Sequence, residues 1–199
     1  MIGIFGGSFD PVHHGHLNNA TSVKQALNLS ELYLMPCANP VHKDGLTFSN
    51  TERLKMLELA CEPLNLRIDT REMDRQGDSY TIDSLIDIAK DHPSETLCLI
   101  IGADSFLQLD TWKDYQAFHQ YCHLVVIKRP ESPLTHRADF GFTLAESAEQ
   151  LKQQPTGLVW FDQGEMLDIS SSEIRGKIAR GEDLSDLLPA SVINHLQQK

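Results

Sequence analysis

GGSFDPVHHGH, residues 6–16, is the stretch that decides how this chain folds. A short apolar run, Ile2–Phe5, precedes it and predicts a buried strand. An amphipathic pattern follows it and predicts a helix that begins near Gly15. Two adjacent glycines at the end of a strand allow the backbone to approach a ligand closely. The start of the helix directs free N–H groups and the positive end of its dipole into the same space, which suits a phosphate.

The histidines of this stretch have more than one interpretation. His13 and His16 are three residues apart, so both can face one ligand at the helix start. A glycine turn before a helix is also common, and scattered histidines are often surface residues. A transition-metal site would use His13, His14 and His16. Such a site needs further ligands, and Asp10 is the only candidate nearby. We therefore expect no metal held by protein side chains.

The same residues carry a family resemblance. The stretch resembles the GxFDPxHxGH signature of the nucleotidylyltransferases, whose HxGH core is shared with class I aminoacyl-tRNA synthetases. The GGSFDPVH lead-in is most similar to that of the bacterial nicotinate-nucleotide adenylyltransferases. The resemblance implies that His13 and His16 are catalytic. It also implies a set of ATP-binding residues here: Gly6, Gly7, Ser8, Phe9, His13 and His16.

A second motif lies near the C-terminus, at residues 169–175. Ser170 and Glu173 have the spacing of a capping box, ahead of a helix that we expect to end near Gly181. Hydroxyls and open N–H groups at a helix start also bind phosphate. The segment resembles the ISSTxIR motif of the adenylyltransferases, with Ser172 at the usual threonine position. The resemblance implies that Arg175 is catalytic and that ATP is bound by Ile169, Ser170, Ser171 and Arg175.

Two features of the middle of the chain resemble the nicotinate pocket of that family. One feature is the tripeptide Ser79-Tyr80-Thr81. The other is the pair Gly102 and Asp104 after an apolar run, with Trp112 eight residues after Asp104. The resemblance implies that Gly102 and Asp104 bind ATP. It further implies that the mononucleotide is bound by Ser79, Tyr80, Thr81, Asp104 and Trp112, with the Trp112 ring on the pyridine. Asp104 has helix capping as an alternative role, and Trp112 has core packing.

Three basic residues match anion contacts of the family in irregular segments. His42 and Lys43 lie in a loop that approaches the mononucleotide phosphate in relatives, where arginine often occupies the second position. Lysine keeps the charge but loses the two-pronged guanidinium fork. Arg129 follows an apolar run and is a further expected contact to the mononucleotide.

Five short apolar runs define the fold class. Strands buried on both faces of a parallel sheet have this unalternating composition, and helical patterns lie between the runs. We expect an α/β fold with a doubly wound parallel sheet, Rossmann-like as in the nucleotidylyltransferases, in one domain spanning residues 1–199. Ligands of such sheets bind where the strand order reverses. The predicted strands are Ile2–Phe5, Leu32–Met35, Leu97–Ile101, Leu124–Ile127 and Leu158–Phe161.

Helices are also predicted from spacing. The pattern Ile82, Leu85, Ile86, Ala89 indicates a helix with Thr81 as its N-cap. Further helices are expected around Leu54–Cys61, over Asp114–Gln120, and after Pro189.

Composition excludes several classes of protein. The 199 residues have a net charge of −11, which argues against a nucleic-acid-binding surface. No apolar run approaches the roughly 20 residues needed to cross a bilayer, and no signal peptide is visible. The four cysteines are widely spaced and predict reduced thiols in a cytoplasmic protein.

The resemblance implies adenylyl transfer from ATP to nicotinate mononucleotide, which yields deamido-NAD and pyrophosphate. The mononucleotide phosphate is itself a nucleophile, so we expect catalysis by positioning and charge stabilisation, chiefly by His16 and Arg175. Mg²⁺ is expected as a cofactor carried by the phosphates. Sister transferases acting on nicotinamide mononucleotide or phosphopantetheine, and a non-catalytic ATP-binding regulator, are the alternatives. A homo-oligomer is compatible with the sequence.

Overall fold

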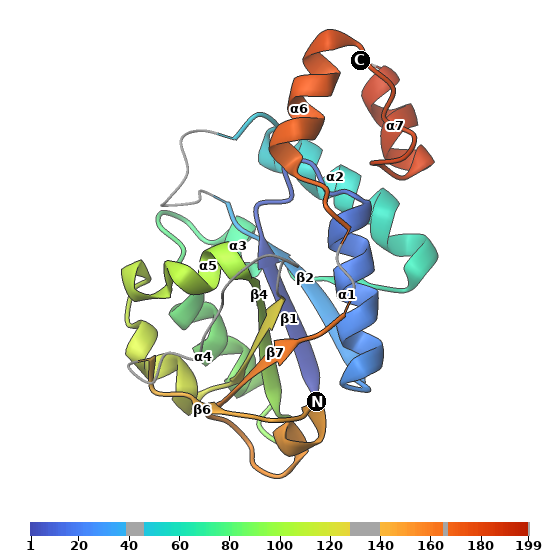
Figure 1. Ribbon diagram of the computed structural model, residues 1–199. Helices are drawn as coiled ribbons and strands as arrows, with labels where there is room; N and C mark the ends of the chain where they lie inside the picture. The colour runs from blue at the N-terminus through green and yellow to red at the C-terminus, as the bar shows by residue number, and fades with distance from the viewer. Residues whose placement is uncertain (39–45, 128–139, 165–166, 199) are drawn as a thin grey trace.

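The computed structural model describes residues 1–38, 46–127, 140–164 and 167–198. Within these residues seven strands form one sheet in the order β3-β2-β1-β4-β5-β7-β6. Every strand pairing is parallel. The fold is therefore the predicted doubly wound α/β fold (Figure 1). The strands are β1 (Ile2–Gly7), β2 (Glu31–Pro36), β3 (Arg67–Ile68), β4 (Leu97–Gly102), β5 (His123–Ile127), β6 (Thr143–Leu144) and β7 (Leu158–Asp162).

All five predicted strands are confirmed, and they form the middle of the sheet. The two strands that the sequence did not predict, β3 and β6, lie at the edges and have two residues each. Strands this short have no apolar run to mark them. The order reverses between β1 and β4, so the switch point lies directly after Gly6 and Gly7, as expected.

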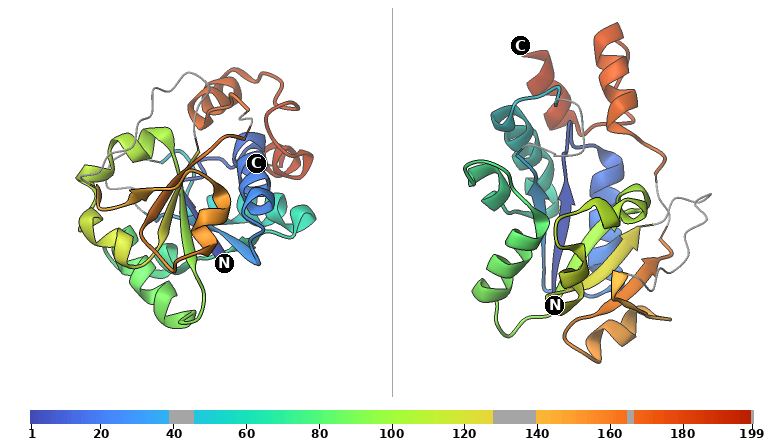
Figure 2. Two further views of the ribbon diagram at one scale, coloured as in Figure 1. Left: turned by 60° about the horizontal axis from the view of Figure 1, so that its bottom comes forward. Right: turned by 90° about the vertical axis from the view of Figure 1, so that its left-hand side faces the viewer.

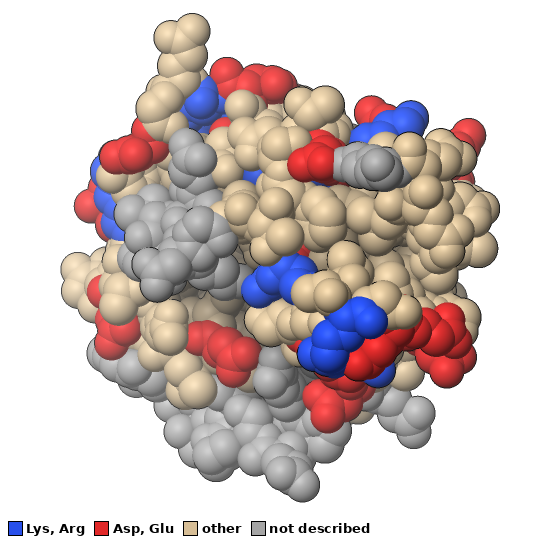
Figure 3. Space-filling model, turned by 90° about the horizontal axis from the view of Figure 1, so that it is seen from above, with Lys and Arg blue, Asp and Glu red and all other residues tan. Residues whose placement is uncertain are grey.

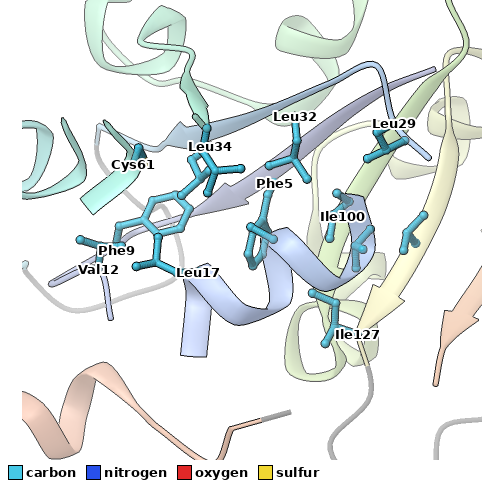
Figure 4. Close-up of a cluster of buried hydrophobic side chains, with 14 of the residues drawn as sticks. Phe5, Phe9, Val12, Leu17, Leu29, Leu32, Leu34, Cys61, Ile100 and Ile127 are labelled. Carbon is cyan, nitrogen blue, oxygen red and sulfur yellow. The ribbon is translucent and has the colours of Figure 1, made fainter. Parts of the chain in front are cut away.

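Helices cover both faces of the sheet (Figures 1 and 2). Side chains of α1 (His14–Ala26) and α2 (Asn50–Cys61) share a buried cluster with Phe5 and Ile100. Figure 4 shows part of this cluster, with Leu17 of α1 turned toward the sheet. Side chains of α4 (Thr81–Asp91) and α5 (Ala103–Leu107) form a second cluster with Ile4 and Ile101. Neighbouring strand residues thus face opposite layers, which fixes the register of each strand.

Two helix predictions were wrong in detail. Thr81 is the first residue of α4, and Tyr80 is the N-cap, because its backbone is extended while its carbonyl accepts from Ser84 N. The segment expected as an α-helix over Asp114–Gln120 is the 3₁₀ helix η3 (Tyr115–Gln120). It begins after a left-handed Asp114 (φ 49°) and closes through bonds three residues apart, such as Ala117 N to Asp114 O.

The last two helices lie at the carboxyl edge of the sheet, at the top of Figure 1. Helix α6 (Ser171–Arg180) has one half of the predicted capping box, since the Ser170 side chain accepts from Glu173 N, and it ends at Gly181 (φ 67°) as expected. Helix α7 (Ala190–Gln197) follows Pro189 as expected. The segment before α7 is tied to the start of α1, because His14 N donates to Leu187 O at 2.9 Å. The C-terminal helices are thereby placed beside the N-terminal motif.

The remaining helical segments connect the layers. They are η1 (Glu62–Leu64), α3 (Arg71–Asp74), η2 (Leu109–Thr111) and η5 (Ala148–Lys152).

Candidate active site

A cavity of about 500 Å³ opens at the switch point of the sheet. This volume suits a small-molecule ligand. Its walls come from the ends of β1, β2 and β4, from α3 and the start of α4, and from α5 and the segment after it. The lining residues include nearly all those predicted for the nucleotide base pocket and glycine loop: Gly6, Gly7, Ser8, Ser79, Tyr80, Thr81, Gly102, Asp104 and Trp112.

The glycine loop is shaped by Phe9. This residue has a left-handed backbone (φ 45°), and its ring is 1% exposed. A Cβ on Gly7 would lie 3.0 Å from that ring, so only glycine fits there without displacing it. The Phe9 ring packs edge-on against Phe5 and His16. Phe9, one of the predicted ATP-binding residues, is therefore buried and supports the loop from inside.

His13 and His16 lie together at the start of α1. Their rings are stacked with centroids 3.7 Å apart, and His13 Nδ1 accepts from His16 N at 3.3 Å as the side-chain cap of the helix. His13 is 4% exposed, and burial, with a smaller effect of His14, lowers its pKa to about 4. His13 is therefore neutral near pH 7. Since Nδ1 is the acceptor, its hydrogen is on Nε2, and this N–H is a suitable donor to a phosphate oxygen.

The start of α6 lies against the same loop. Ser171 Oγ donates to Pro11 O at 3.2 Å, and Arg175 Nη1 donates to Asp10 O at 2.8 Å. Arg175 also donates to Ser172 Oγ, and its Nη1 lies 3.6 Å from the Asp10 carboxylate. Two helix N-termini, those of α1 and α6, thus meet at residues 10–13, although 160 residues separate Ser171 from Pro11 in the sequence. The positive ends of two helix dipoles are thus brought together beside Arg175.

Asp10 holds the loop that leads into α2. Its two carboxylate oxygens accept from Thr47 N at 3.0 Å and Phe48 N at 2.9 Å, and the residue is 3% exposed. Sequence analysis considered Asp10 only as a metal ligand. The structure gives it a different role, in which it joins the α6 arginine to the segment before α2.

Arg53 was missed by sequence analysis. This arginine of α2 is fully buried. Its guanidinium donates to the carbonyls of Ser8 (2.6 Å), Cys37 (2.7 Å) and Ala38 (3.2 Å), and to Asn50 Oδ1 (2.7 Å). It therefore fastens the loop after β1 to the end of β2.

A signal for Arg53 was present in the sequence. Arg53 occupies the apolar face of α2, at helical spacing from Met56, Leu57 and Ala60, all of which are buried. A charged residue on such a face requires internal partners.

The base-side wall of the cavity settles one of the two alternatives left open by the sequence. Gly102, not Asp104, is the N-cap of α5, so capping does not explain Asp104. Trp112 has both roles: it lines the cavity and packs edge-on against the buried Phe118, with ring centroids 6.2 Å apart. Two further charged residues, Glu72 and Lys113, line the same wall and were not predicted.

The predicted site residues thus form two groups joined by the loop 8–13. One group lines the cavity, and the other, with His13, His16, Ser170, Ser171 and Arg175, surrounds the starts of α1 and α6. Ile169 lies beside the second group, since a Cβ on Gly15 would be 3.5 Å from Ile169 Cβ. His42, Lys43 and Arg129 lie outside the described residues. Among the residues that are described, no three His, Cys, Asp or Glu side chains are placed to hold a metal ion.

The surface at this end of the sheet is mixed in charge. Figure 3 looks onto it from above, and Lys and Arg side chains form small separate groups beside Asp and Glu. In the part of the chain that the structure describes, no helix is long and apolar enough to span a membrane.

Comparison with known proteins places this site in a family. The family model described as cytidylyltransferase-like matches residues 4–177. The chain therefore has the fold and family of the nucleotidyltransferases.

Relatives narrow the family further. A protein of Vesicomyosocius okutanii named probable nicotinate-nucleotide adenylyltransferase is 49% identical over 98% of this chain and 93% of its own length. A Methylococcus capsulatus protein of the same name is 38% identical over 100% of this chain and 98% of its own. The chain belongs to the nicotinate-nucleotide adenylyltransferase family.

Solved structures agree on the fold. The nicotinic acid mononucleotide adenylyltransferase of Plasmodium falciparum, complexed with NaAD, superposes with a TM-score of 0.75 at 19% identity, covering 99% of this chain and 94% of that one.

Proposed function

We propose that this protein transfers the adenylyl group of ATP to nicotinate mononucleotide, forming deamido-NAD and pyrophosphate. The observation that carries the proposal is the placement of the glycine loop and the wall of Ser79, Asp104 and Trp112 around one cavity at the switch point. That cavity offers backbone to a phosphate at one side and an aromatic ring with hydrogen-bonding groups to a base at the other. The names of the relatives and the NaAD complex of the Plasmodium falciparum enzyme support it.

The reaction needs no covalent enzyme intermediate. An oxygen of the mononucleotide phosphate attacks the α-phosphorus of ATP, the new P–O bond forms, and the bond from the α-phosphorus to the pyrophosphate oxygen breaks. Negative charge grows on the departing pyrophosphate and on the α-phosphoryl oxygens. Groups fixed at the starts of α1 and α6 are suited to stabilise that charge, and Mg²⁺ enters with ATP as part of the substrate.

Individual residues have separate roles in this scheme. Neutral His13 donates from Nε2 to a phosphate oxygen and holds the start of α1. His16 and Arg175 stabilise the charge that develops in the transition state, and Ser171 binds phosphate at the start of α6. Arg175 is tied to Asp10 and Ser172 in the structure, with its side chain 31% exposed. Its fork is therefore held in place before substrate arrives, which lowers the cost of binding.

The alternatives differ in what the cavity must accept. A phosphopantetheine transferase needs no aromatic ring for a pyridine, whereas Trp112 lines this cavity. A regulator that binds ATP without turnover needs no preorganised set of charge-stabilising groups. A nicotinamide mononucleotide transferase differs from the proposed enzyme in one functional group of the substrate, so only direct comparison separates the two.

Pyrophosphate release is the test. The purified protein is mixed with Mg²⁺ and ATP, then with nicotinate mononucleotide, nicotinamide mononucleotide or phosphopantetheine in turn. The proposal expects fast release with nicotinate mononucleotide and little without a second substrate. Equal or faster release with phosphopantetheine, or no release despite ATP binding, would overturn it.

A further inference from the structure

Behind the base-side wall of the cavity lies a chain of hydrogen bonds that the reaction scheme does not use. Arg75 Nη1 donates to Ser79 Oγ at 2.7 Å and to Ser84 Oγ at 3.2 Å, and Nη2 pairs with Asp87 Oδ2 at 3.1 Å. Ser84 Oγ in turn donates to Glu72 Oε1 at 3.0 Å. Ser84 is fully buried, and Glu72 is 5% exposed. The network therefore connects two residues of the cavity wall, Glu72 and Ser79, through Ser84 and Arg75.

The direction of these bonds determines what Ser79 can offer a ligand. A hydroxyl has one hydrogen to donate, and a guanidinium can only donate. Because Arg75 donates to Ser79 Oγ, the hydrogen of that hydroxyl must point to another acceptor. Ser79 lines the cavity, so this hydrogen is available to a ligand there.

The adjacent helix start adds donors of the same kind. Tyr80, the N-cap of α4, makes no side-chain capping bond to the first turn. The first N–H groups of α4 and the positive end of its dipole therefore reinforce the Ser79 hydroxyl. Such a wall favours a group with two acceptor oxygens over an amide, which has one acceptor and an NH₂ donor.

We propose that Arg75 is the positioning residue that sets the preference for an acidic pyridine substrate, by fixing Ser79 as a donor and by offsetting the charge of Glu72. This inference rests on the proposed function. Glu72 lines the cavity, so its carboxyl group faces the same space that would receive the substrate carboxylate. Arg75 and Glu72 thus act on the preference in opposite directions. Asp104 and Lys113 also line the cavity. The Lys113 side chain is 45% exposed, so solvent screens its charge.

Four variants test this proposal, with kcat/KM measured for nicotinate and nicotinamide mononucleotides. Arg75→Gln should lower the nicotinate-over-nicotinamide ratio by roughly tenfold. In free energy, this change is a small part of the Coulomb interaction between two unit charges in contact. Ser79→Ala, which removes little volume, should lower it by about three- to tenfold, since hydrogen bonds to charged groups are stronger than those to neutral ones. Glu72→Gln should raise the ratio, and KM for ATP should stay within about twofold in all three.

Arg71→Gln is the matched control. Arg71 lies on the same segment with nearly the same exposure, 22% against 23% for Arg75, and pairs with Asp69 and Asp91 instead of the cavity wall. It should leave the ratio unchanged. A purely structural role for the network predicts something else: Arg75→Gln and Glu72→Gln would both lower the melting temperature and total activity, with an unchanged ratio.

The outcomes are separable. An unchanged ratio in Arg75→Gln and Ser79→Ala, or an equal fall in Arg71→Gln, overturns this inference while the parent enzyme still makes deamido-NAD. If Arg75→Gln fails to fold, Ser79→Ala and Glu72→Gln decide between the two accounts. A parent enzyme that makes no deamido-NAD overturns the proposed function itself, and this inference with it.

Discussion

At the scale of single residues, the central feature is a pair of histidines with different environments. His13 is buried and serves as a helix cap, while His16 is partly exposed and lies between the His13 ring and the ring of Phe9, whose centroid is 5.0 Å away. Identical side chains three residues apart therefore differ in burial and in the contacts they make. The spacing could be seen in the sequence, but the difference in burial depends on the packing of the loop.

His16→Ala should lower kcat by about 10²–10³-fold, the loss typical of removing one preorganised donor. The melting temperature should fall by only a few degrees, since the variant loses ring contacts at the edge of the core. His14→Ala, in the same turn, is the control and should retain nearly full turnover. Near-normal kcat in His16→Ala, or loss of folding, would show that His16 does not act on the transition state.

His13 predicts a pH dependence of stability. Its folded pKa, about 4, lies below the ordinary value of 6.5. Folding therefore favours the neutral form of His13. The contribution of His13 to the free energy of unfolding is fully present above pH 6.5 and is lost as the pH falls toward 4. The loss is about 3 kcal/mol.

Denaturant unfolding at several pH values measures this effect. His13→Asn keeps an acceptor at the N-cap and should flatten the curve below pH 6.5. The buried His123, whose pKa is also lowered by burial, remains in both proteins and leaves some slope. A variant with the full slope of the parent would contradict the assignment of His13 as neutral.

Trp112 can report directly on the base pocket. The chain has two tryptophans, Trp112 and Trp160. In a Trp160→Phe protein, nicotinate mononucleotide should quench the remaining fluorescence by stacking on Trp112, whereas a Trp112→Phe protein should show no change. Trp112→Ala should raise KM for the mononucleotide several-fold and spare that for ATP, because such stacking contributes on the order of 1 kcal/mol. Equal losses for both substrates would identify Trp112 as a core residue.

At the scale of elements, the site is made by the convergence of two helix starts on one loop. The start of α1 near Gly15 and the start of α6, with Ser170 as its cap, were each predicted from local sequence. Their contact through Ser171, Arg175 and residues 10–11 follows from how α6 and α7 fold over the carboxyl edge. No local pattern encodes that contact, so sequence analysis reached it only through the family resemblance.

The contacts of Arg53 could not be predicted from the sequence either. Its four acceptors are three backbone carbonyls and one amide oxygen from separate segments, and backbone groups leave no trace in the identity of residues. Arg53→Lys should destabilise the fold by at least about 2 kcal/mol, since one ammonium cannot satisfy all of them and buried carbonyls lose their donors.

The measurement for Arg53→Lys is the free energy of unfolding in urea. Arg67→Lys is the control, because the Arg67 side chain is 61% exposed, and its change should lie within about 0.5 kcal/mol. A loss as small in Arg53→Lys as in Arg67→Lys would mean that the loop after β1 does not depend on the guanidinium.

At the scale of the whole molecule, the strand order places the cavity. Parallel strands with short apolar sequences could be predicted, and with them the switch point after Gly7. The edge strands β3 and β6, the 3₁₀ conformation of residues 115–120, and the network of Glu72, Arg75 and Ser84 could not. Each depends on contacts between distant segments instead of on periodicity. The molecule has a net charge of −11, and the starts of α1 and α6 meet at the carboxyl edge of its sheet.

The central claim is that this end of the sheet transfers an adenylyl group to nicotinate mononucleotide in preference to its amide. A competition experiment tests it directly: the protein, ATP and Mg²⁺ are incubated with equal concentrations of nicotinate and nicotinamide mononucleotides, and both dinucleotide products are quantified at early times. We expect deamido-NAD in excess over NAD by at least about tenfold, because hydrogen bonds to a carboxylate are stronger than those to an amide. Equal amounts of the two products, or an excess of NAD, would contradict it.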